Sequence, residues 1–504
     1  MGSIEGLPII EINIDNGDIF DHSDPEENLW IHRIANKLHI NTRQITIANH
    51  LLFGLGDAYN EELAEETERL LRSRGYIHDA KITAEAVCGK GVRINVATTD
   101  NWTLTPSISA SQSGGETRTA IEIEESNFLG YGIGLKILSK SDEDRDTNSI
   151  EYLDTNWLGN FKILDIALAD NSDGHRYATS LSRPFIQQDS RYAWSVSALS
   201  LERENPIFEA GKRVGEVGQE TESYSFSYGW SKGSIDGVVH RHSLGFFSNN
   251  TDYFTVDDPS IELPEDTDNS YPVYQYSYQK VKYVERMNFR VMGVTEDLRL
   301  GTSFGYQFGW KNDTFNVDQP GAVLSLNYDF GRFISSKTLS IVNLYLQHET
   351  NDTIDDTGLF DGRTRIYHHL DENNSYLFTG QFQAALNPEL FERIEIGGDS
   401  GLKGYPIRFQ AGERALTMSV ERRLYFNAYL WRLVKFGYAV FGEVGSAWDT
   451  GEEPVWLSDV GAGFRVASTR QSSSNVLHID LAFPLTETSD IDNYQLFIEA
   501  KGEF

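Results

Sequence analysis

The chain has 504 residues, a mean hydropathy of −0.40 and a formal net charge of −32. No apolar run of about 18 or more residues occurs, which excludes a transmembrane helix, and the acidic balance disfavours nucleic acid because its phosphates would be repelled. The single cysteine, Cys88, excludes an intrachain disulfide.

Residues 1–100 mix strand and helix signals. Isoleucines alternate with polar residues over 10–14, which predicts a strand, while residues 31–38 and 63–71 place apolar side chains at helical spacing. Two further alternating segments surround a glycine-rich turn over 82–96 and predict a hairpin. The sequence therefore predicts a small α+β domain over residues 1–100.

Residues 101–504 lose the helical period and become a series of alternating segments of roughly ten residues, separated by polar turns. In the clearest segment, residues 477–485, the odd-numbered side chains are apolar and the even-numbered ones are mostly polar or small. A soluble sandwich would also alternate, but serial repetition over this length favours a membrane all-β fold, an antiparallel transmembrane β-barrel. A tally of the segments gives roughly 18 or 19 strands.

The end of the chain supports a membrane barrel. Its last segment places one row of apolar side chains on a single face and ends on an aromatic residue; the row comprises Tyr494, Leu496, Ile498 and Phe504. This ending resembles the C-terminal recognition signal of outer-membrane barrels. We therefore expect the barrel in a Gram-negative outer membrane, with the N-terminal domain in the periplasm.

Two stretches of the chain resemble each other. Residues 126–143 and 156–173 each contain a strand end, an aromatic-Leu-Gly turn and a second strand. Hairpin duplication can widen a barrel because closure keeps every strand paired.

One glycine-rich stretch, residues 397–411, resembles the lid loop of the BamA/TamA superfamily, whose motif is a glycine pair followed by an apolar residue, Arg, Gly and an aromatic residue. The positions that match are Gly397, Gly398, Leu402, Lys403, Gly404 and Tyr405. Downstream, Phe441, Glu443 and Gly445 resemble the family's F-x-D-x-G strand motif.

Two other segments match the same superfamily, which is also known as the bacterial surface antigen family. Residues 127–132 resemble its N-x-L-G-x-G turn, and residues 56–59 together with residues 70–76 resemble a POTRA domain. The sequence departs from the family in Lys403, where Arg is usual, in Glu443, where Asp is usual, and in having room for only one POTRA-like domain. The resemblance implies a barrel of about 16 strands, and the internal repeat leaves about 18 strands as the alternative.

A barrel of this size leaves a lumen wide enough for water. The resemblance implies that the loop between strands eleven and twelve folds inward as a lid, and that its basic residue pairs with an acid on the wall. Alternation places Phe441, Glu443 and Gly445 on one face of their predicted strand, together with small residues. On the preceding predicted strand, Glu421 lies on the face that is also expected to line the lumen. We therefore expect a Lys403–Glu443 pair; the alternative is that Lys403 is a solvated loop charge.

The junction between the first and last barrel strands is expected to be weak. Pro106 cannot donate a ladder hydrogen bond, and Gly502 offers no side chain to pack. Such a seam is what a lateral gate needs, unless Pro106 stands at the start of its strand.

Candidate catalytic and metal sites are not found in the sequence. The Gly-Asp-Ser-Gly run at 398–401 is similar to a protease nucleophile segment, but Leu402 follows where the oxyanion turn needs glycine. The histidines are scattered, and acidic turns such as residues 252–268 are expected to be solvated loops, with divalent cations beside lipid headgroups as the alternative. We expect no enzyme activity, no cofactor and no resident metal.

Three functions remain open at this point. The first is a BamA/TamA-like factor that helps to insert or translocate polypeptides, with unfolded outer-membrane or secreted polypeptides as clients. The second is a dedicated secretion or lipid-transport pore, and the third is a structural barrel or passive porin. Outer-membrane lipids and lipopolysaccharide would surround the protein in each case; a homodimer is left open.

Overall fold

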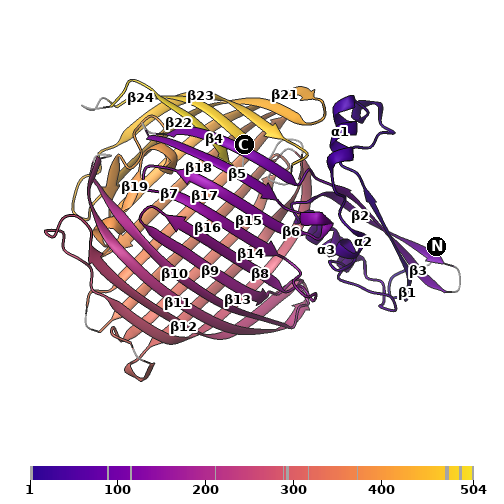
Figure 1. Ribbon diagram of the computed structural model, residues 1–504, viewed down its shortest axis with the longest axis horizontal. Helices are drawn as coiled ribbons and strands as arrows, with labels where there is room; N and C mark the ends of the chain where they lie inside the picture. Colours follow the sequence, from indigo (N-terminus) through magenta and orange to yellow (C-terminus); the bar gives the residue numbers. More distant parts are fainter. Residues whose placement is uncertain are drawn as a thin grey trace.

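The computed structural model describes residues 4–87, 90–113, 116–209, 212–287, 289–290, 294–315, 317–352, 354–371, 373–471, 476–486 and 491–501. A small N-terminal domain lies at one end of a large β-barrel (Figure 1). Among these residues, no helix is long and apolar enough to cross a membrane.

The N-terminal domain is a three-stranded sheet packed against helices. Its elements are β1 (Ile9–Gly17), α1 (Trp30–Leu38), α2 (Gln44–Ala48), α3 (Glu61–Arg72), β2 (Ile77–Val87) and β3 (Gly91–Asp100). The central strand, β3, is parallel to β1 and antiparallel to β2. Alternate residues of β3, Val92, Ile94 and Val96, form the core with Ile47 of α2 and Leu71 of α3. Burial of these apolar faces drives the sheet and helices together.

The barrel is one antiparallel sheet whose strand order closes on itself, with β25 next to β4. Its strands are β4 (Leu104–Ser113), β5 (Glu116–Glu125), β6 (Ile133–Ser141), β7 (Asp146–Asp154), β8 (Ile163–Asn171), β9 (Gly174–Arg183), β10 (Tyr192–Glu209), β11 (Lys212–Ile235), β12 (Val238–Thr255), β13 (Thr267–Met287), β14 (Thr295–Lys311), β15 (Gly321–Ser335), β16 (Thr338–Asn351), β17 (Thr357–Asp371), β18 (Asn374–Leu386), β21 (Arg414–Leu430), β22 (Val434–Trp448), β23 (Leu457–Ser468), β24 (Val476–Pro484) and β25 (Gln495–Lys501).

The described residues thus give a barrel of twenty strands, β4–β18 and β21–β25, so the expectation of 16 strands, or of 18, is wrong. Strands β10–β14 contain 17 to 24 residues each, far more than the segments of the sequence tally. Their polar ends, such as residues 212–223 of β11, have the composition of loops. Turns as short as Asp236-Gly237 join them. Alternation therefore did not mark where these strands begin and end.

The additional strands lie before the 397–411 loop. Five barrel strands, β21–β25, follow this loop. That number agrees with a lid between strands eleven and twelve of a 16-stranded barrel, as the resemblance implies. The extra strands therefore widen the part of the wall that precedes the loop, and a wider barrel encloses a larger lumen.

The two faces of the barrel wall differ as alternation predicts. On the outer face, the exposed side chains of Ile123, Ile137 and Ile150 lie side by side on β5, β6 and β7. On β24, Phe483 is exposed, whereas the neighbouring Ala482 is buried on the inner face. An apolar outer face and a polar lumen are typical of membrane barrels.

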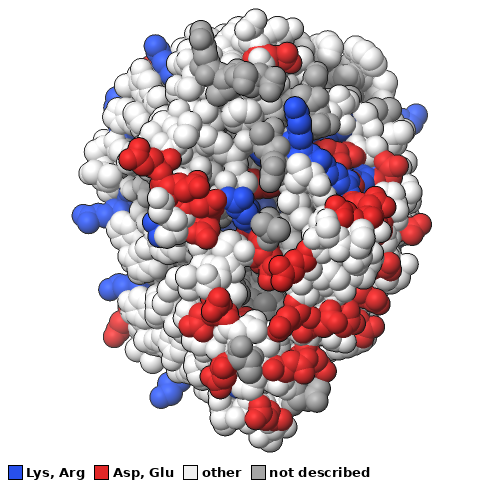
Figure 2. Space-filling view, turned by 90° about the vertical axis from the view of Figure 1, so that its left-hand side faces the viewer, with Lys and Arg blue, Asp and Glu red and all other residues white. Residues whose placement is uncertain are grey.

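Charge is unevenly distributed between the two ends of the barrel. Figure 2 shows acidic side chains gathered around the end opposite the N-terminal domain. The connection between β12 and β13, residues 256–266, lies among the most acidic parts of the chain.

The N-terminal domain is docked onto the near end of the barrel through the internal repeat. The turn over 127–132 accepts two hydrogen bonds at the Gly130 carbonyl, from the Arg43 amide (3.0 Å) and the Thr46 hydroxyl (2.7 Å). The turn over 156–161 donates from the Asn156 side chain to the Asn49 carbonyl (3.2 Å). Both copies of the repeated turn therefore hold α2 and its immediate flanks.

Further contacts fix the domain around the rim. The Arg72 guanidinium pairs with Asp297 at the start of β14 (2.9 Å), and the His32 ring bonds to the Trp431 carbonyl between β21 and β22 (2.7 Å). Arg470, between β23 and β24, pairs with Glu27 (2.6 Å). These barrel partners lie on or beside strands that are far apart in the closed strand order, so the domain spans the mouth of the barrel.

Candidate functional site

The 397–411 loop connects β18 to β21 and is closed at its base by a short hairpin, β19 (Ile394–Ile396) with β20 (Gln410–Gly412). It contacts the inner face of the wall. Its partners Asp459 and Asp480 are each 1% exposed, whereas Val460 and Leu481, their neighbours in sequence, are exposed on the outer face. The loop therefore lies inside the barrel.

Glycines of the motif are required by the close approach of backbones. Gly397 and Gly398 have φ values of 123° and 61°, which other residues rarely adopt. A Cβ on Gly404 would lie 2.6 Å from the Asp459 Cβ and 3.0 Å from the Pro484 nitrogen. Only glycine at this position lets the loop backbone reach the wall, where the Gly404 N–H donates to Asp459 (2.9 Å).

Apolar residues of the motif form a small core under the loop. Leu402 and Tyr405 are 1% and 0% exposed and pack with Leu457 of β23. The Tyr405 hydroxyl donates to the Ser458 carbonyl (2.9 Å). Gly445 leaves room for this core, since a Cβ there would lie 3.3 Å from Leu402.

Lys403 is the charged contact at the centre of the loop. Its ammonium lies 3.5 Å from the Glu443 carboxylate and 3.6 Å from the Asp480 carboxylate. It also lies 3.9 Å from the centre of the Phe441 ring, a cation–π arrangement. The Lys403 backbone N–H donates a further hydrogen bond to Glu443 (2.8 Å). The structure thus brings Lys403 and Glu443 together and adds Asp480 as a second partner.

The wall beneath the loop carries a buried network of charges. Arg465 is 0% exposed and pairs with Asp480 and, at 3.3 Å, with Glu421. Glu421 also pairs with Arg423 of the same strand. Buried charges that are paired in this way add little net stability, but removal of one partner leaves its neighbours uncompensated and costs about 3–5 kcal/mol.

A second group of contacts holds the parts of the loop on either side of Lys403. Arg408 forms a bidentate pair with Asp144, between β6 and β7, at 2.8 and 2.9 Å. Asp399 pairs with Arg118 of β5 (2.8 Å). Burial raises the pKa of the Asp144 carboxyl, but hydrogen bonds and charge from Arg408 outweigh burial, so the pKa lies below its ordinary value.

The two groups of contacts lie on opposite sides of the junction between the first and last barrel strands. Lys403 binds β22 and β24, whereas Arg408 and Asp399 bind the β5–β7 region. In the sheet order, β25 and β4 lie between these regions. The loop is therefore a strap across the inner side of the seam, fixed by ion pairs on both sides of that junction.

A polar cavity of about 560 Å³ lies beside the loop. It is bounded by Asp399 and Ser400 of the loop and by Arg363, Gln381 and Glu443 of the wall. Space for water or for an extended polar chain thus remains next to the strap.

Other residues singled out in the sequence lie as follows. Pro106 is the third residue of β4 and is opposite Ile123, so it stands inside the strand. Leu496 and Ile498 pair with Leu481 and Ile479 of β24, on the outward-facing row. Tyr494 is 56% exposed just before β25. Gly502 and Phe504 lie outside the described residues.

Sequence reasoning missed the partners that join distant parts of the chain. Asp459 and Asp480 share the inward parity that identified Glu443, so parity could have found them as wall residues. Arg408 and Asp144 are separated by 264 positions and carry no shared motif, so no sequence signal pairs them.

No protein-family model matches the chain. No curated protein matches it either. Among solved structures, CdiB from Acinetobacter baumannii is 12% identical with a TM-score of 0.50, covering 99% of this chain and 74% of that one. CdiB from Escherichia coli is 10% identical with a TM-score of 0.50, covering 97% of this chain and 76% of that one.

BamA from Haemophilus ducreyi lacking POTRA domains 1–3 is 12% identical, with a TM-score of 0.43 and coverage of 97% of this chain and 84% of that one. The two CdiB structures carry the comparison, and at their identities the likeness is one of fold. The chain has the fold of a large barrel of this type with a small domain at one mouth.

Proposed function

We propose that this protein is an outer-membrane barrel of the BamA/TamA type that assists the insertion or translocation of polypeptides. The single observation that carries the proposal is the ion-paired strap inside a CdiB-like barrel, held across the first–last strand junction by Lys403 on one side and Arg408 on the other. A passive barrel has no need of a buried loop that braces one junction.

We infer the orientation of the protein in the membrane from the apolar outer face of the barrel and from the difference between its two ends. The apolar outer face, as at Ile123 and Ile137, suits a bilayer. The N-terminal domain would lie in the periplasm, and the acidic end would face outward, among lipopolysaccharide and its counter-ions. Outer-membrane lipids are thus expected partners, whereas nucleic acid is not.

The N-terminal domain offers a docking surface for clients. Its outer strands, β1 and β2, each pair with β3 on one side only within the sheet. An unfolded polypeptide could add a strand at such an edge through main-chain hydrogen bonds. A POTRA-like role for this domain rests on that geometry and on the sequence resemblance; neither implies enzyme chemistry or a cofactor.

Folding of a client barrel tests the proposal. Proteoliposomes containing the full chain should accelerate the folding of a urea-unfolded small outer-membrane barrel relative to empty liposomes, measured by heat-modifiable gel migration. A disulfide between Ser107→Cys and Lys501→Cys, in a Cys88→Ser background, should abolish the acceleration until reductant is added. Equal folding rates with and without the protein would refute the proposal.

A dedicated secretion or lipid-transport pore is the second candidate. The twenty-stranded barrel and the polar cavity beside the strap favour it, because a wide polar lumen suits a chain passing through. If the crosslinked protein still moved a passenger across the bilayer, the route would be the lumen and this candidate would replace the first. Steady, ungated conductance of the wild type would instead indicate a passive porin.

A further inference from the structure

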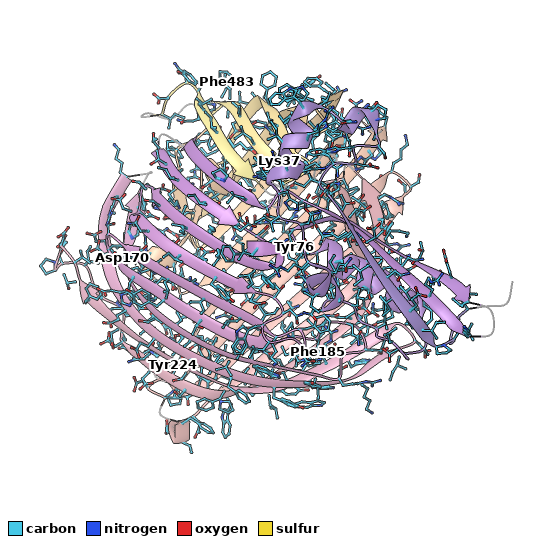
Figure 3. All side chains as sticks on the ribbon, turned by 45° about the vertical axis from the view of Figure 1, so that its right-hand side comes forward. Lys37, Tyr76, Asp170, Phe185, Tyr224 and Phe483 are labelled. Atoms are coloured by element: carbon cyan, nitrogen blue, oxygen red, sulfur yellow. The ribbon has the colours of Figure 1, made fainter. Side chains whose placement is uncertain are left out.

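A cavity of about 270 Å³ lies between the N-terminal domain and the barrel. One side is the turn between α3 and β2, residues 73–76, and the other is the inner wall of β5–β7 near the domain. Figure 3 shows Tyr76 at this junction. The cavity is separate from the 397–411 loop, which contacts the same wall at the other ends of these strands, through Arg118 near the start of β5 and Asp144 between β6 and β7.

Arg74 brings a positive charge to this cavity without a negative partner. Its side chain lines the cavity, and its Nε atom is buried with no hydrogen-bond partner. Within the described part of the chain, Arg74 forms no ion pair. Burial lowers the pKa of its guanidinium, yet arginine remains protonated in proteins. Arg74 as a whole is half-buried, and a charge partly withdrawn from water in this way is stabilised when an opposite charge is bound beside it.

Three hydroxyl groups line the same cavity and are also unpartnered. Tyr76 is 5% exposed, and its hydroxyl has no hydrogen-bond partner. The hydroxyls of Ser126 and Thr155, on the barrel side, are buried without partners as well. Buried polar groups are nearly always hydrogen-bonded, so several orphans around one cavity indicate an occupant that forms hydrogen bonds. The hydroxyls can donate or accept, but the Arg74 N–H can only donate and therefore needs an acceptor.

The cavity has an electrostatic polarity. Glu124, Lys136 and Glu151 line it on the barrel side, where the Lys136 ammonium lies 3.8 Å from Glu151. Glu124 and Glu151 lie within β5 and β7, whereas Ser126 and Thr155 follow the last residues of these strands, nearer the N-terminal domain. The carboxylates therefore repel an anion toward the hydroxyls. A negatively charged occupant would therefore be held at the end formed by Arg74 and the hydroxyls.

We propose that this cavity binds a phosphate-type oxyanion. The Arg74 guanidinium donates to two oxygens in its fork geometry, and the hydroxyls of Tyr76, Ser126 and Thr155 donate to the others. A tetrahedral oxyanion accepts from several directions at once, which matches donors that come from both sides of the cavity. The anion is either free phosphate or the phosphate of a lipid headgroup.

Binding at this position joins two parts of the protein. Arg74 and Tyr76 belong to the N-terminal domain, whereas Ser126 and Thr155 belong to the barrel. An oxyanion that contacts all four stabilises the docked arrangement, because it binds that arrangement and not the separated one. Occupancy thus sets how firmly the domain closes the near mouth.

Isothermal titration of the full chain in maltoside micelles tests the site. Inorganic phosphate, added at constant ionic strength against chloride, should bind with one-to-one stoichiometry. Arg74→Gln should weaken binding at least tenfold, and Thr155→Val, which keeps the shape of the side chain, should weaken it several-fold. Arg93→Gln serves as the matched control, because Arg93 lies on the same domain but is partly exposed and paired with Glu11 (2.8 Å).

A second arm uses glycerophosphoethanolamine, a headgroup without acyl chains. Tighter binding than phosphate, lost in Arg74→Gln, assigns the site to a lipid headgroup; weaker binding assigns it to free phosphate. The proposal is overturned if wild type binds neither probe, or if Arg74→Gln and Thr155→Val bind as wild type does. Client folding is not measured here, so failure of the proposed function and failure of this site remain distinguishable.

Discussion

Asn127 and Asn156 make the same hydrogen bond in two copies of one turn. Each side-chain oxygen accepts the backbone N–H five residues later, from Gly132 at 2.6 Å and from Phe161 at 2.8 Å. In each turn the third and fourth residues, Leu then Gly, have positive φ values. The internal repeat is thus a duplicated docking element. Its two copies, between β5 and β6 and between β7 and β8, both contact the N-terminal domain.

Substitution at the repeated glycines should separate docking from turn strain. Gly130 and Gly159 both have a φ of 78°, so alanine strains both turns by roughly 1 kcal/mol. At Gly130, however, a Cβ would lie 2.6 Å from the Asn41 carbonyl of the N-terminal domain, whereas at Gly159 nothing lies within 4 Å. We expect Gly130→Ala to loosen the domain and Gly159→Ala to leave it docked.

The measurement is the distribution of spin-label distances between α3 and β15 in the full chain. Gly130→Ala should broaden it, and Gly159→Ala should match wild type. Equal broadening in both variants would mean that turn strain, not contact with the domain, sets the docking.

Lys403 is expected to keep the strap closed. Lys403→Ala leaves Glu443 and Asp480 without their shared cation, and planar-bilayer recordings should show larger or more frequent openings than wild type. Lys403→Arg should stay closed. A Lys403→Glu, Glu443→Lys swap should recover closure poorly, because the new glutamate would face Asp480. Lys37→Ala, at an exposed position on α1, provides the control. Unchanged conductance in Lys403→Ala would show that Lys403 does not keep the strap closed.

Arg408 and Asp144 are expected to act as one unit on the seam. Arg408→Gln and Asp144→Asn should each increase hydrogen exchange of β25 amides several-fold, because either change loosens the strap on the β5–β7 side of the seam. The double variant should exchange no faster than the single ones, since both break the same bidentate pair. Arg414→Gln, an exposed change on β21, should have no effect. Additive effects in the double variant would contradict a shared role.

The N-terminal domain should lose stability in mild acid. Burial, with the charge of Arg74 as a smaller cause, lowers the pKa of His50 to about 4 from its ordinary 6.5. His50 therefore becomes protonated near pH 6.5 in the unfolded chain but only near pH 4 in the folded domain. The contribution of neutral His50 to the free energy of unfolding is fully present above pH 6.5. It decreases by about 3 kcal/mol as the pH falls toward 4.

Pulse proteolysis of the full chain in urea, between pH 7 and 4, measures this loss. Burial also lowers the pKa of His78 on β2 to about 4, so His50→Phe should reduce the pH dependence by about half. His22→Gln, at an exposed position, should retain the wild-type slope. An undiminished wild-type slope in His50→Phe would assign the acid sensitivity to other groups.

Alternation and motif together were enough to predict the class of fold and the centre of the candidate site. The period of two fixes which face a residue occupies, so the inward positions of Glu421 and Glu443 followed from parity. The glycines around Lys403 indicated a loop in close contact with another backbone, and the structure supplies that contact at Asp459.

Register, strand number and long-range pairing were decided only by the tertiary structure. Parity is unchanged when a strand is longer, when two more hairpins are present or when the sheet closes with a different stagger, so twenty strands could not be distinguished from 16 or 18. The Arg408–Asp144 pair, the second partner of Lys403 and the cavity at Arg74 each depend on where segments far apart in sequence meet. Local periodicity carries no information about which distant segments come into contact. Closure of the barrel and docking of the N-terminal domain determine these contacts.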